Sequence, residues 1–330
     1  MTEFRAYRVP EEGGESRGGI EQLTTADLPE GDVLIRAEWS SINYKDALAV
    51  TGKGKILRTF PLTPGIDVAG KVESSSAGEF EPGQSVLVTG CGMGEVHSGG
   101  FAEYVRVPAS WVVPVPECYT TREAMALGTA GFTAALALLR MESCGQTPET
   151  GDIVITGASG GVGSLAVNML SAAGYRVIAV SGKPDAAEQL HMLGAAEVVT
   201  PDDLQLGSRP LEKARFGGVI DSVGGELLAG LLPHIRDYGN VAAIGLAGGV
   251  KVQTTVMPFI LRGVSLLGIS SANCPRDLRL AAWRRLGADL RPPRLEEIVT
   301  GEVGLDDLPE ASQALIERRS RGRTLVRLTG

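Results

Sequence analysis

Two stretches of this chain carry the residue types that bind a dinucleotide, and the first is VITGASGGVGSLAV (154–167). An apolar run there passes through four glycines into a helical pattern. Glycines let the backbone turn tightly toward a pyrophosphate, and a helix N-terminus offers unpaired N–H groups. A strand before the turn and a helix after it indicate a dinucleotide site, with a tight structural turn as the alternative. We expect the pyrophosphate to be surrounded by Ser159, Gly160, Gly161 and Val162.

The second stretch is VSGK (180–183), which ends the next strand-like run. A site for NAD usually has an acid here, which binds the ribose 2′-OH and would repel a 2′-phosphate. The hydroxyl of Ser181 and the ammonium of Lys183 instead both donate to a phosphate, and Gly182 leaves room for it. The pattern predicts NADP as the cofactor. The alternative is that Lys183 is an ordinary solvated lysine.

The elements that must position these residues alternate between strands and helices after about residue 122. Strand-like runs DIVITG (152–157), RVIAVSG (176–182) and FGGVIDSVGG (216–225) are separated by helical patterns, and EVVT, GNVAAIGLAGG and VSLLGISS continue the series. This alternation predicts an α/β fold with a Rossmann-type, doubly wound parallel sheet.

The N-terminal part has a different sequence pattern. Short β-like runs such as DVLIRAEWSSI (32–42) and FAEYVRVP (101–108) are separated by Gly and Pro. That spacing predicts a small barrel-like β domain. A chain of 330 residues is long enough for two domains. We expect one at 1–125, a dinucleotide domain at 126–299, and a return of 300–330 to the first.

Composition limits the classes of function. The formal net charge of −8 disfavours a general nucleic-acid or anionic-membrane surface. The first residues are polar, and we expect no run apolar enough to span a bilayer. The four cysteines and three histidines are scattered, which favours free thiols in a cytoplasmic protein and disfavours a zinc site.

Motifs along nearly the whole chain resemble the zinc-independent medium-chain dehydrogenase/reductase superfamily. They are SSINYKDALAVTG (40–52), PLTPGIDVAGKV (61–72), ALGTAGFTAALAL (126–138), VITGASGGVGSLAV (154–167) and GRTLVRL (322–328). NYKDAL, VTGCGMGEVHSGGFAEY, VSGK and ILRGVSLLGISS resemble its acrylyl-CoA reductase branch, often labelled quinone oxidoreductase. The resemblance implies a GroES-like N-terminal domain, a homodimer, and reduction of acryloyl-CoA to propanoyl-CoA with NADPH.

This chain departs from the zinc-dependent members of that superfamily. In PGIDVAG, Ile66 and Asp67 have no neighbouring Cys or His, and the four-cysteine lobe is missing. We therefore expect no metal, a condition that suits hydride transfer to an activated C=C bond better than alcohol oxidation.

The resemblance places the segment Asn43–Asp46 beside the nicotinamide. Tyr44 is the first catalytic candidate, because a phenol can hydrogen-bond a developing enolate or donate a proton. The alternative is that Tyr44 only packs on the nicotinamide. Asn43 and Asp46 are supporting candidates, with local turn hydrogen bonds as their alternative. For Asp67 we favour a structural role.

Further cofactor contacts are expected from the resemblance at Thr129 and Arg323, and from strand ends at Gly245, Leu246, Ser270 and Ser271. Arg323 is otherwise a surface charge, and Thr129 otherwise bonds its own helix backbone. The arginine clusters 284–294 and 318–321 are either solvated faces or contacts for coenzyme A phosphates. We expect Cys91 to be an inert thiol, because no His–acid pattern lies near it in the sequence.

Three functions are open at this point. The first is NADPH-dependent reduction of an α,β-unsaturated acyl-CoA, and the second is reduction of a quinone or free enone. The third is a non-catalytic NADPH-binding regulatory or RNA-binding protein, against which the net acidity and Tyr44 argue.

Overall fold

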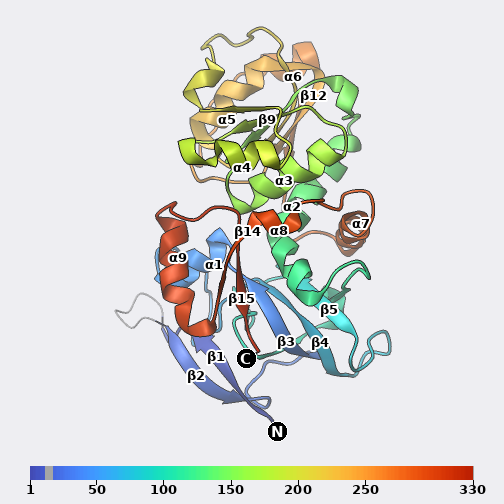
Figure 1. The fold of residues 1–330 in the computed structure, drawn as a ribbon, viewed down its shortest axis with the longest axis vertical. Coiled ribbons are helices and arrows are strands. Elements are labelled where there is room, and N and C mark those ends of the chain that lie inside the picture. Colours follow the sequence, from blue (N-terminus) through green and yellow to red (C-terminus); the bar gives the residue numbers. More distant parts are fainter. Residues whose placement is uncertain (12–17, 330) are drawn as a thin grey trace. The chain divides into compact units, whose positions relative to one another are not determined.

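The computed structural model describes residues 1–11 and 18–329, which divide into two compact units (Figure 1). Unit 1 comprises Met1–Thr129, Ser271–Leu280 and the C-terminal segment from Ile298, and unit 2 comprises Ala130–Ser270 and Ala281–Glu297. The segment 271–280 thus belongs to unit 1, whereas the sequence analysis put it in the dinucleotide domain. The division falls within two helices, α2 (Thr121–Glu142) and α7 (Arg276–Leu286).

Unit 1 is built on a sheet in the order β14-β15-β3-β4-β5-β7, with β6 also paired to β3 and a separate hairpin β1-β2. The strands are β1 (Glu3–Arg8), β2 (Gly19–Thr24), β3 (Val33–Ser41), β4 (Asp67–Ser75), β5 (Ser85–Thr89), β6 (Tyr104–Val107), β7 (Val113–Pro114), β14 (Val299–Val303) and β15 (Arg323–Arg327). β15 pairs antiparallel with β3, so the C-terminal strand extends the sheet that the N-terminal part begins.

The core of unit 1 follows from alternation along its strands. Val33, Ile35 and Ala37 on β3 are fully buried, while Arg36 between them is exposed. This period of two places one face of the strand against the core. The helices α1 (Tyr44–Thr51) and α9 (Leu308–Ile316) pack against one another beside it.

Unit 2 contains a parallel sheet in the order β10-β9-β8-β11-β12-β13 (Figure 1). Its strands are β8 (Ile153–Thr156), β9 (Val177–Val180), β10 (Glu197–Val199), β11 (Phe216–Asp221), β12 (Ile235–Ala243) and β13 (Ser265–Gly268). The connecting helices are α3 (Gly161–Ala172), α4 (Ala187–Met192), α5 (Gly225–Leu231) and α6 (Met257–Arg262), and α8 (Leu295–Ile298) follows later. Relabelled in chain order, the strands run 3-2-1-4-5-6, the order of the Rossmann fold. The predicted doubly wound α/β sheet is confirmed.

Some elements differ from the sequence-based expectation. The hairpin β1-β2 and helix α1 were not predicted. Strand β12 begins at Ile235 rather than near Gly239, because its pairing with β11 shifts register and absorbs the turn-like residues before Asn240.

The helix α2 corrects another expectation. It is long and apolar enough, by length and composition, to span a membrane, although we expected no such run. Its most apolar window is 83% buried inside the protein, and its backbone is non-helical at Gly128. A core helix passes the same test of composition, because both environments favour apolar side chains.

Candidate active site

The glycine turn joins β8 to α3 and presents the N-terminus of that helix. Gly160 is the N-cap residue, with φ −85° and ψ 176°, and the first N–H groups of a helix have no partner within it. At Gly163 a Cβ atom would lie 2.3 Å from the carbonyl oxygen of Gly157. Only glycine therefore lets the helix pack this close to the turn. The geometry fits a pyrophosphate over the residues from Ser159 to Val162.

The end of β9 lies against this turn. Ser181 Oγ donates a hydrogen bond to Ser159 Oγ at 3.2 Å and accepts one from the Lys183 N–H at 3.1 Å. A Cβ placed on Gly182 would have no described atom within 4 Å, so there is space beside the strand end. Lys183 is half-buried rather than fully solvated. The fold thus brings the two predicted stretches together.

The other predicted cofactor residues of unit 2 share the same edge of the sheet, because the carboxyl ends of parallel strands lie together. The residues that follow β8, β9, β12 and β13 there are Ser159, Gly160, Gly161, Val162, Ser181, Gly182, Lys183, Gly245, Leu246 and Ser270. Ser271 belongs to unit 1, as do Tyr44, Thr129 and Arg323.

Sequence reasoning missed Asp221, which ends β11 at this edge. Its Oδ1 accepts a hydrogen bond from Thr156 Oγ1 at 2.6 Å, and its Oδ2 accepts one from the Gly224 N–H at 2.7 Å. Burial raises the pKa of the Asp221 carboxyl, and these hydrogen bonds oppose the rise. Asp221 ties the ends of β8 and β11 together. The acid that follows the apolar run FGGVI was the available signal.

In unit 1 a buried carboxylate at the start of β4 is the centre of a polar network. Asp67 Oδ2 accepts hydrogen bonds from Ser41 Oγ at 2.7 Å and from Asn43 Nδ2 at 2.8 Å. The Thr129 N–H donates to the same oxygen at 2.9 Å, and Thr129 Oγ1 donates to Asp67 Oδ1 at 2.5 Å. The Thr129 hydroxyl proton is therefore committed to Asp67.

Arg323 supplies the cation of this network and is 2% exposed. Its Nη2 donates to Ser41 Oγ at 2.6 Å and lies 3.7 Å from Asp67 Oδ2, and its Nη1 donates to Asn43 Oδ1 at 3.0 Å. Burial lowers the pKa of the guanidinium, and the Asp67 charge opposes that shift. The alternative that Arg323 is a surface charge is wrong. Its contact with a cofactor stays a prediction.

The segment Asn43–Asp46 forms the N-terminus of α1. Asn43 is the N-cap, and Asp46 Oδ2 accepts hydrogen bonds from the Asn43 N–H at 2.9 Å and from Asn43 Nδ2 at 3.1 Å. Asp46 Oδ1 accepts one from the Ile66 N–H at 2.8 Å. These are the local turn hydrogen bonds that the sequence left as an alternative.

Asp46 and Tyr44, at the start of the same helix, differ sharply in exposure. Asp46 is 1% exposed, and burial together with the charge of Asp67 raises its pKa to about 7. Tyr44, the first residue of the helix, is 46% exposed. Tyr44 is therefore the member of the predicted catalytic set that a ligand can reach most readily.

The kink in α2 completes the network. Gly128 has φ 49° and ψ −152°, so the helix is interrupted one residue before Thr129. A Cβ at Gly128 would lie 2.5 Å from Asp67 Oδ2 and 2.8 Å from Arg323 Nη2. The absence of a side chain here lets the kinked backbone reach the buried ion pair.

The remaining candidates have structural partners. Burial raises the pKa of the Cys91 thiol, as expected for an inert cysteine. Three residues of the arginine clusters form ion pairs. Arg285 pairs with Glu142 and Asp289, Arg294 with Glu297, and Arg319 with Glu317.

This combination of a Rossmann unit and an N-terminal β unit has a direct counterpart among protein families. Residues 29–117 match the alcohol dehydrogenase GroES-like domain, and residues 161–287 match the zinc-binding dehydrogenase family. The chain belongs to the medium-chain dehydrogenase/reductase superfamily of oxidoreductases, as its motifs predicted.

The relatives with high identity cover almost the whole chain. A protein of Escherichia coli K12 provisionally named acrylyl-CoA reductase AcuI is 48% identical over 98% of this chain and 100% of its own. Acrylyl-CoA reductase AcuI of Ruegeria pomeroyi is 44% identical over 96% of both chains. A Bacillus subtilis protein provisionally named quinone oxidoreductase YhfP is 45% identical over 99% of both.

Solved structures agree with the fold. The crystal structure of E. coli K-12 YhdH with bound NADPH has a TM-score of 0.94 at 48% identity, covering 98% of this chain and 100% of that one. B. subtilis YhfP with NAD bound has a TM-score of 0.96 at 44% identity, covering 99% and 100%.

The description of the second family implies a zinc ion, which would need a cluster of metal-ligating side chains. Among residues 1–11 and 18–329, no three His, Cys, Asp or Glu side chains gather in a way that could hold a metal ion. Asp67, a buried acid of unit 1, accepts hydrogen bonds from Ser41 and Thr129 and pairs with Arg323. The residues do not fit a zinc site.

Proposed function

We propose that this protein reduces the C=C bond of an α,β-unsaturated acyl-CoA with NADPH, and that its substrate is acryloyl-CoA. The observation that carries the proposal is full-length identity of 48% and 44% to two proteins named acrylyl-CoA reductase. The matched length covers 98% and 96% of this chain, so the similarity extends over both units.

NADP is the cofactor. Structures of relatives that are 46% and 48% identical contain NADP and NADPH. The glycine turn fits the pyrophosphate, and at the end of β9 the ammonium of Lys183 and the space beside Gly182 suit a 2′-phosphate. The relative that was crystallised with NAD shows why both nucleotides must be compared in experiments.

When bound, NADPH supplies the hydride, which adds to the β-carbon of the substrate while a proton adds to the α-carbon. The chain's own part is to stabilise the negative charge that develops on the thioester oxygen. The exposed Tyr44 phenol donates a hydrogen bond to that oxygen or the proton to the α-carbon. Asn43 and Asp46 hold the helix N-terminus that carries Tyr44. No metal takes part in this proposal.

The test is the decay of nicotinamide absorbance with acryloyl-CoA, measured with NADPH and NADH in parallel and with a quinone as comparison. We expect oxidation of NADPH with acryloyl-CoA to exceed both the quinone reaction and the NADH reaction. Turnover with the quinone alone would contradict the proposal that acryloyl-CoA is the substrate. Preference for NADH would overturn the account of the β9 end.

A second candidate is reduction of a quinone or free enone with NADPH. The 45% identical B. subtilis relative carries a quinone oxidoreductase name, which favours it. A third candidate, a non-catalytic NADPH-binding regulatory or RNA-binding protein, would show tight NADPH binding, no turnover with either substrate class, and a salt-dependent shift of RNA.

We also propose a homodimer formed through the edge of the unit 2 sheet. β13 ends that sheet and pairs only with β12 among the described strands. Leu266 on this strand is 40% exposed, and Ile260 and Leu261 on the neighbouring helix α6 are 72% and 60% exposed. Exposed apolar side chains beside an open strand edge favour association with another chain.

The protein is proposed to work in the cytoplasm. All four cysteines are free thiols, which fits a reducing compartment. Cell fractionation with an antibody to the native protein tests this, and recovery outside the cytoplasmic fraction would contradict it.

A further inference from the structure

Seven residues connect the last strand of the unit 2 sheet to helix α7, and we call them, residues 269–275, the connecting segment. All seven are in the described part of the chain and lie in neither a strand nor a helix. The chain passes from unit 2 to unit 1 between Ser270 and Ser271, two of the predicted cofactor contacts. A segment without its own strand or helix hydrogen bonds needs other contacts to hold binding residues in place.

Arg279 on α7 supplies such contacts and is 2% exposed. Its Nη2 donates hydrogen bonds to the backbone oxygens of Ser271 at 2.9 Å and Ala272 at 3.4 Å. Its Nη1 donates to the backbone oxygen of Thr89 at 2.6 Å and to Thr89 Oγ1 at 2.9 Å. One buried guanidinium therefore ties the connecting segment to the end of β5 within unit 1.

The backbone that follows β5 also holds the connecting segment. The Cys91 N–H donates a hydrogen bond to the backbone oxygen of Ala272 at 3.1 Å. Gly90 has φ 71°, and a Cβ there would lie 2.9 Å from Ala272 Cα. A glycine is needed here because the left-handed backbone and the close approach both exclude a side chain. The arginine and the backbone after β5 thus fix the segment together.

The chemistry of a guanidinium suits this bridging role. Its N–H donors form a rigid planar fork, so acceptors on two segments are held at fixed relative positions. Taking the group out of water costs free energy, which the charge-assisted hydrogen bonds offset. An apolar side chain of similar length would fill the same space without that cost. It would not fix the carbonyl groups of Ser271 and Thr89, which is what the arginine adds.

The connecting segment begins far along the sheet from the strand end that suits the 2′-phosphate. β9 and β13 are four strand positions apart in the order β9-β8-β11-β12-β13. Neighbouring strands lie about 4.8 Å apart, so this separation is about 19 Å. A dinucleotide lies across the carboxyl ends of the strands. With the 2′-phosphate at β9 and the pyrophosphate at the glycine turn after β8, the nicotinamide half extends toward β13.

We propose that Arg279 is a positioning residue for the nicotinamide half of NADP. By holding the carbonyl groups of Ser271 and Ala272 it fixes the course of the connecting segment. The segment in turn places Ser270 and Ser271, which we expect to contact that half of the cofactor. The inference rests on NADP as the cofactor and is independent of the substrate. Arg279 itself has no contact with the reacting atoms in this proposal.

The experiment compares two nucleotides on the variant Arg279→Met, which removes the donors and keeps an unbranched side chain. NADPH should bind about tenfold more weakly, because the segment that contacts its nicotinamide half must now be ordered on binding. Adenosine 2′,5′-bisphosphate lacks that half and reaches only the β9 end of the sheet. Its Kd should stay within about twofold of the wild type. Calorimetric titration of the folded protein measures both.

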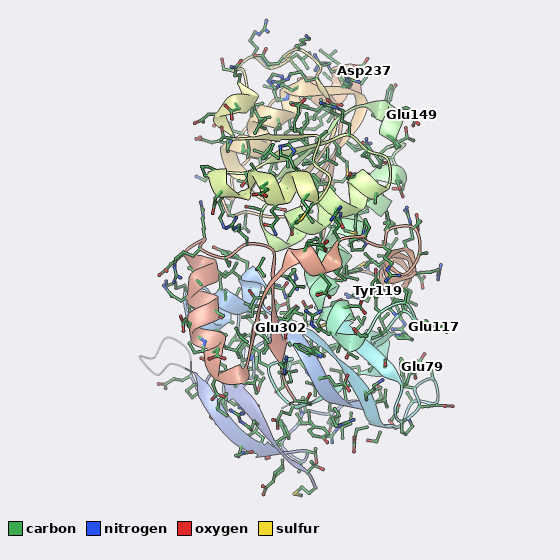
Figure 2. All side chains as sticks on the ribbon, viewed as in Figure 1. Glu79, Glu117, Tyr119, Glu149, Asp237 and Glu302 are labelled. Atoms are coloured by element: carbon green, nitrogen blue, oxygen red, sulfur yellow. The ribbon has the colours of Figure 1, made fainter. Side chains whose placement is uncertain are left out.

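The matched control is Arg276→Met, on the same helix. Arg276 Nη1 donates to the backbone oxygens of Ser110 at 2.6 Å and Val112 at 3.2 Å. Its Nη2 lies 3.9 Å from an oxygen of Glu79, which is labelled in Figure 2. Arg276 therefore also binds backbone carbonyl groups of unit 1, but on a different segment. Arg276→Met should lose stability toward urea, as Arg279→Met should, and keep both Kd values within about twofold of the wild type.

An unchanged Kd for NADPH in folded Arg279→Met would overturn the proposal, because the arginine would then only stabilise the fold. Equal losses for the two nucleotides, or for the two arginine variants, would overturn it as well, since both results indicate a general loosening. If Arg279→Met does not fold, Arg279→Lys takes its place. An ammonium keeps the charge but has no rigid fork to bridge both segments, so the same selective loss for NADPH is expected.

Discussion

At the end of β9, we expect two side chains to decide which nicotinamide nucleotide suits the Rossmann unit. Ser181 is held by Ser159 of the glycine turn, and Lys183 donates its N–H to Ser181 Oγ. The hydroxyl is therefore positioned by the turn itself, while the ammonium of Lys183 supplies charge. An acid at this place would repel the 2′-phosphate that distinguishes NADPH from NADH.

Replacing Lys183 with alanine should weaken NADPH binding far more than NADH binding. Loss of one charge-assisted contact with a phosphate predicts about 1.5–3 kcal/mol, or roughly 10- to 150-fold in Kd. Fluorescence titration with each nucleotide measures this. Equal losses for NADPH and NADH would show that Lys183 does not recognise the 2′-phosphate.

Replacing Tyr44 with phenylalanine removes only the phenol oxygen from an exposed residue. We expect kcat with acryloyl-CoA to fall by roughly 100-fold, the usual contribution of a proton donor or oxyanion donor. The Kd for NADPH should stay within about twofold of the wild type. A variant that keeps its kcat would remove Tyr44 from the mechanism.

At the scale of elements, Asp67 joins parts of unit 1 that lie far apart in sequence. It contacts the end of β3 through Ser41, the N-cap of α1 through Asn43 and the kink of α2 through Thr129. Arg323 at the start of β15 neutralises it. A buried ion pair with these further hydrogen bonds is strongly destabilised when one partner is removed or displaced.

The kink of α2 can be tested with Gly128→Ala. A Cβ there would approach both Asp67 and Arg323, and φ is 49°. We expect a loss of about 3–5 kcal/mol in the free energy of unfolding of unit 1, measured with urea. The matched control is Gly83→Ala in the same unit, where φ is 85° but no described atom lies within 4 Å of the new Cβ. That control should lose only about 1 kcal/mol.

If both glycine variants lose the same stability, the positive φ alone explains Gly128, and the close approach to the ion pair has no measurable effect. That result would contradict the account of the kink.

The buried Asp46 should make stability depend on pH. Its pKa is raised from 3.8 to about 7 by burial and by the Asp67 charge, so between these values the folded state binds more protons than the unfolded state. Stability must then fall as pH rises through this window. We expect about 2–3 kcal/mol to be lost between pH 5 and pH 8, since one pKa unit corresponds to about 1.4 kcal/mol. Urea unfolding across this range measures the loss.

The comparison for this pH effect is Asp46→Asn, which removes the titrating group. Its baseline stability should be lower, because its amide faces the Ile66 and Asn43 N–H donors. Its stability should nevertheless change less with pH than that of the wild type. Parallel curves for the two proteins would contradict the role of Asp46.

At the scale of the whole molecule, charge and apolar surface have separate roles. The net charge of −8 disfavours a general anion-binding surface. Ile260 and Leu261 on α6 and Leu266 on β13 are exposed, although Phe259 of the same helix packs against the core of unit 2. Their exposure is the physical basis for the proposed homodimer.

The dimer can be tested with Ile260→Glu, which places a charge on this apolar surface. Analytical ultracentrifugation should show a dimer for the wild type and a shift toward the monomer for the variant, by tenfold or more in Kd. The NADPH affinity should remain, because Ile260 lies on α6 rather than in the glycine turn. A wild-type monomer, or an undisturbed variant dimer, would contradict the proposed interface.

The sequence by itself determined the features that depend on local patterns. The glycine turn, the strand end with Ser181 and Lys183, and the alternation of strands and helices could all be predicted, because they reflect backbone conformation and periodic burial over a few neighbouring residues. The motifs around Tyr44 likewise indicated the superfamily.

Only the tertiary structure decided how distant polar residues combine. Arg323 lies 256 positions from Asp67 in the chain, and no local pattern predicts that they meet in a buried network with Ser41. The resemblance made Asn43 and Asp46 supporting catalytic candidates, and the structure shows that Asp46 is buried and that both residues form the hydrogen bonds at the N-terminus of the helix of Tyr44. A part for them in catalysis stays a prediction. Burial and charge pairing depend on contacts between segments far apart in sequence, and these exist only once the chain has folded.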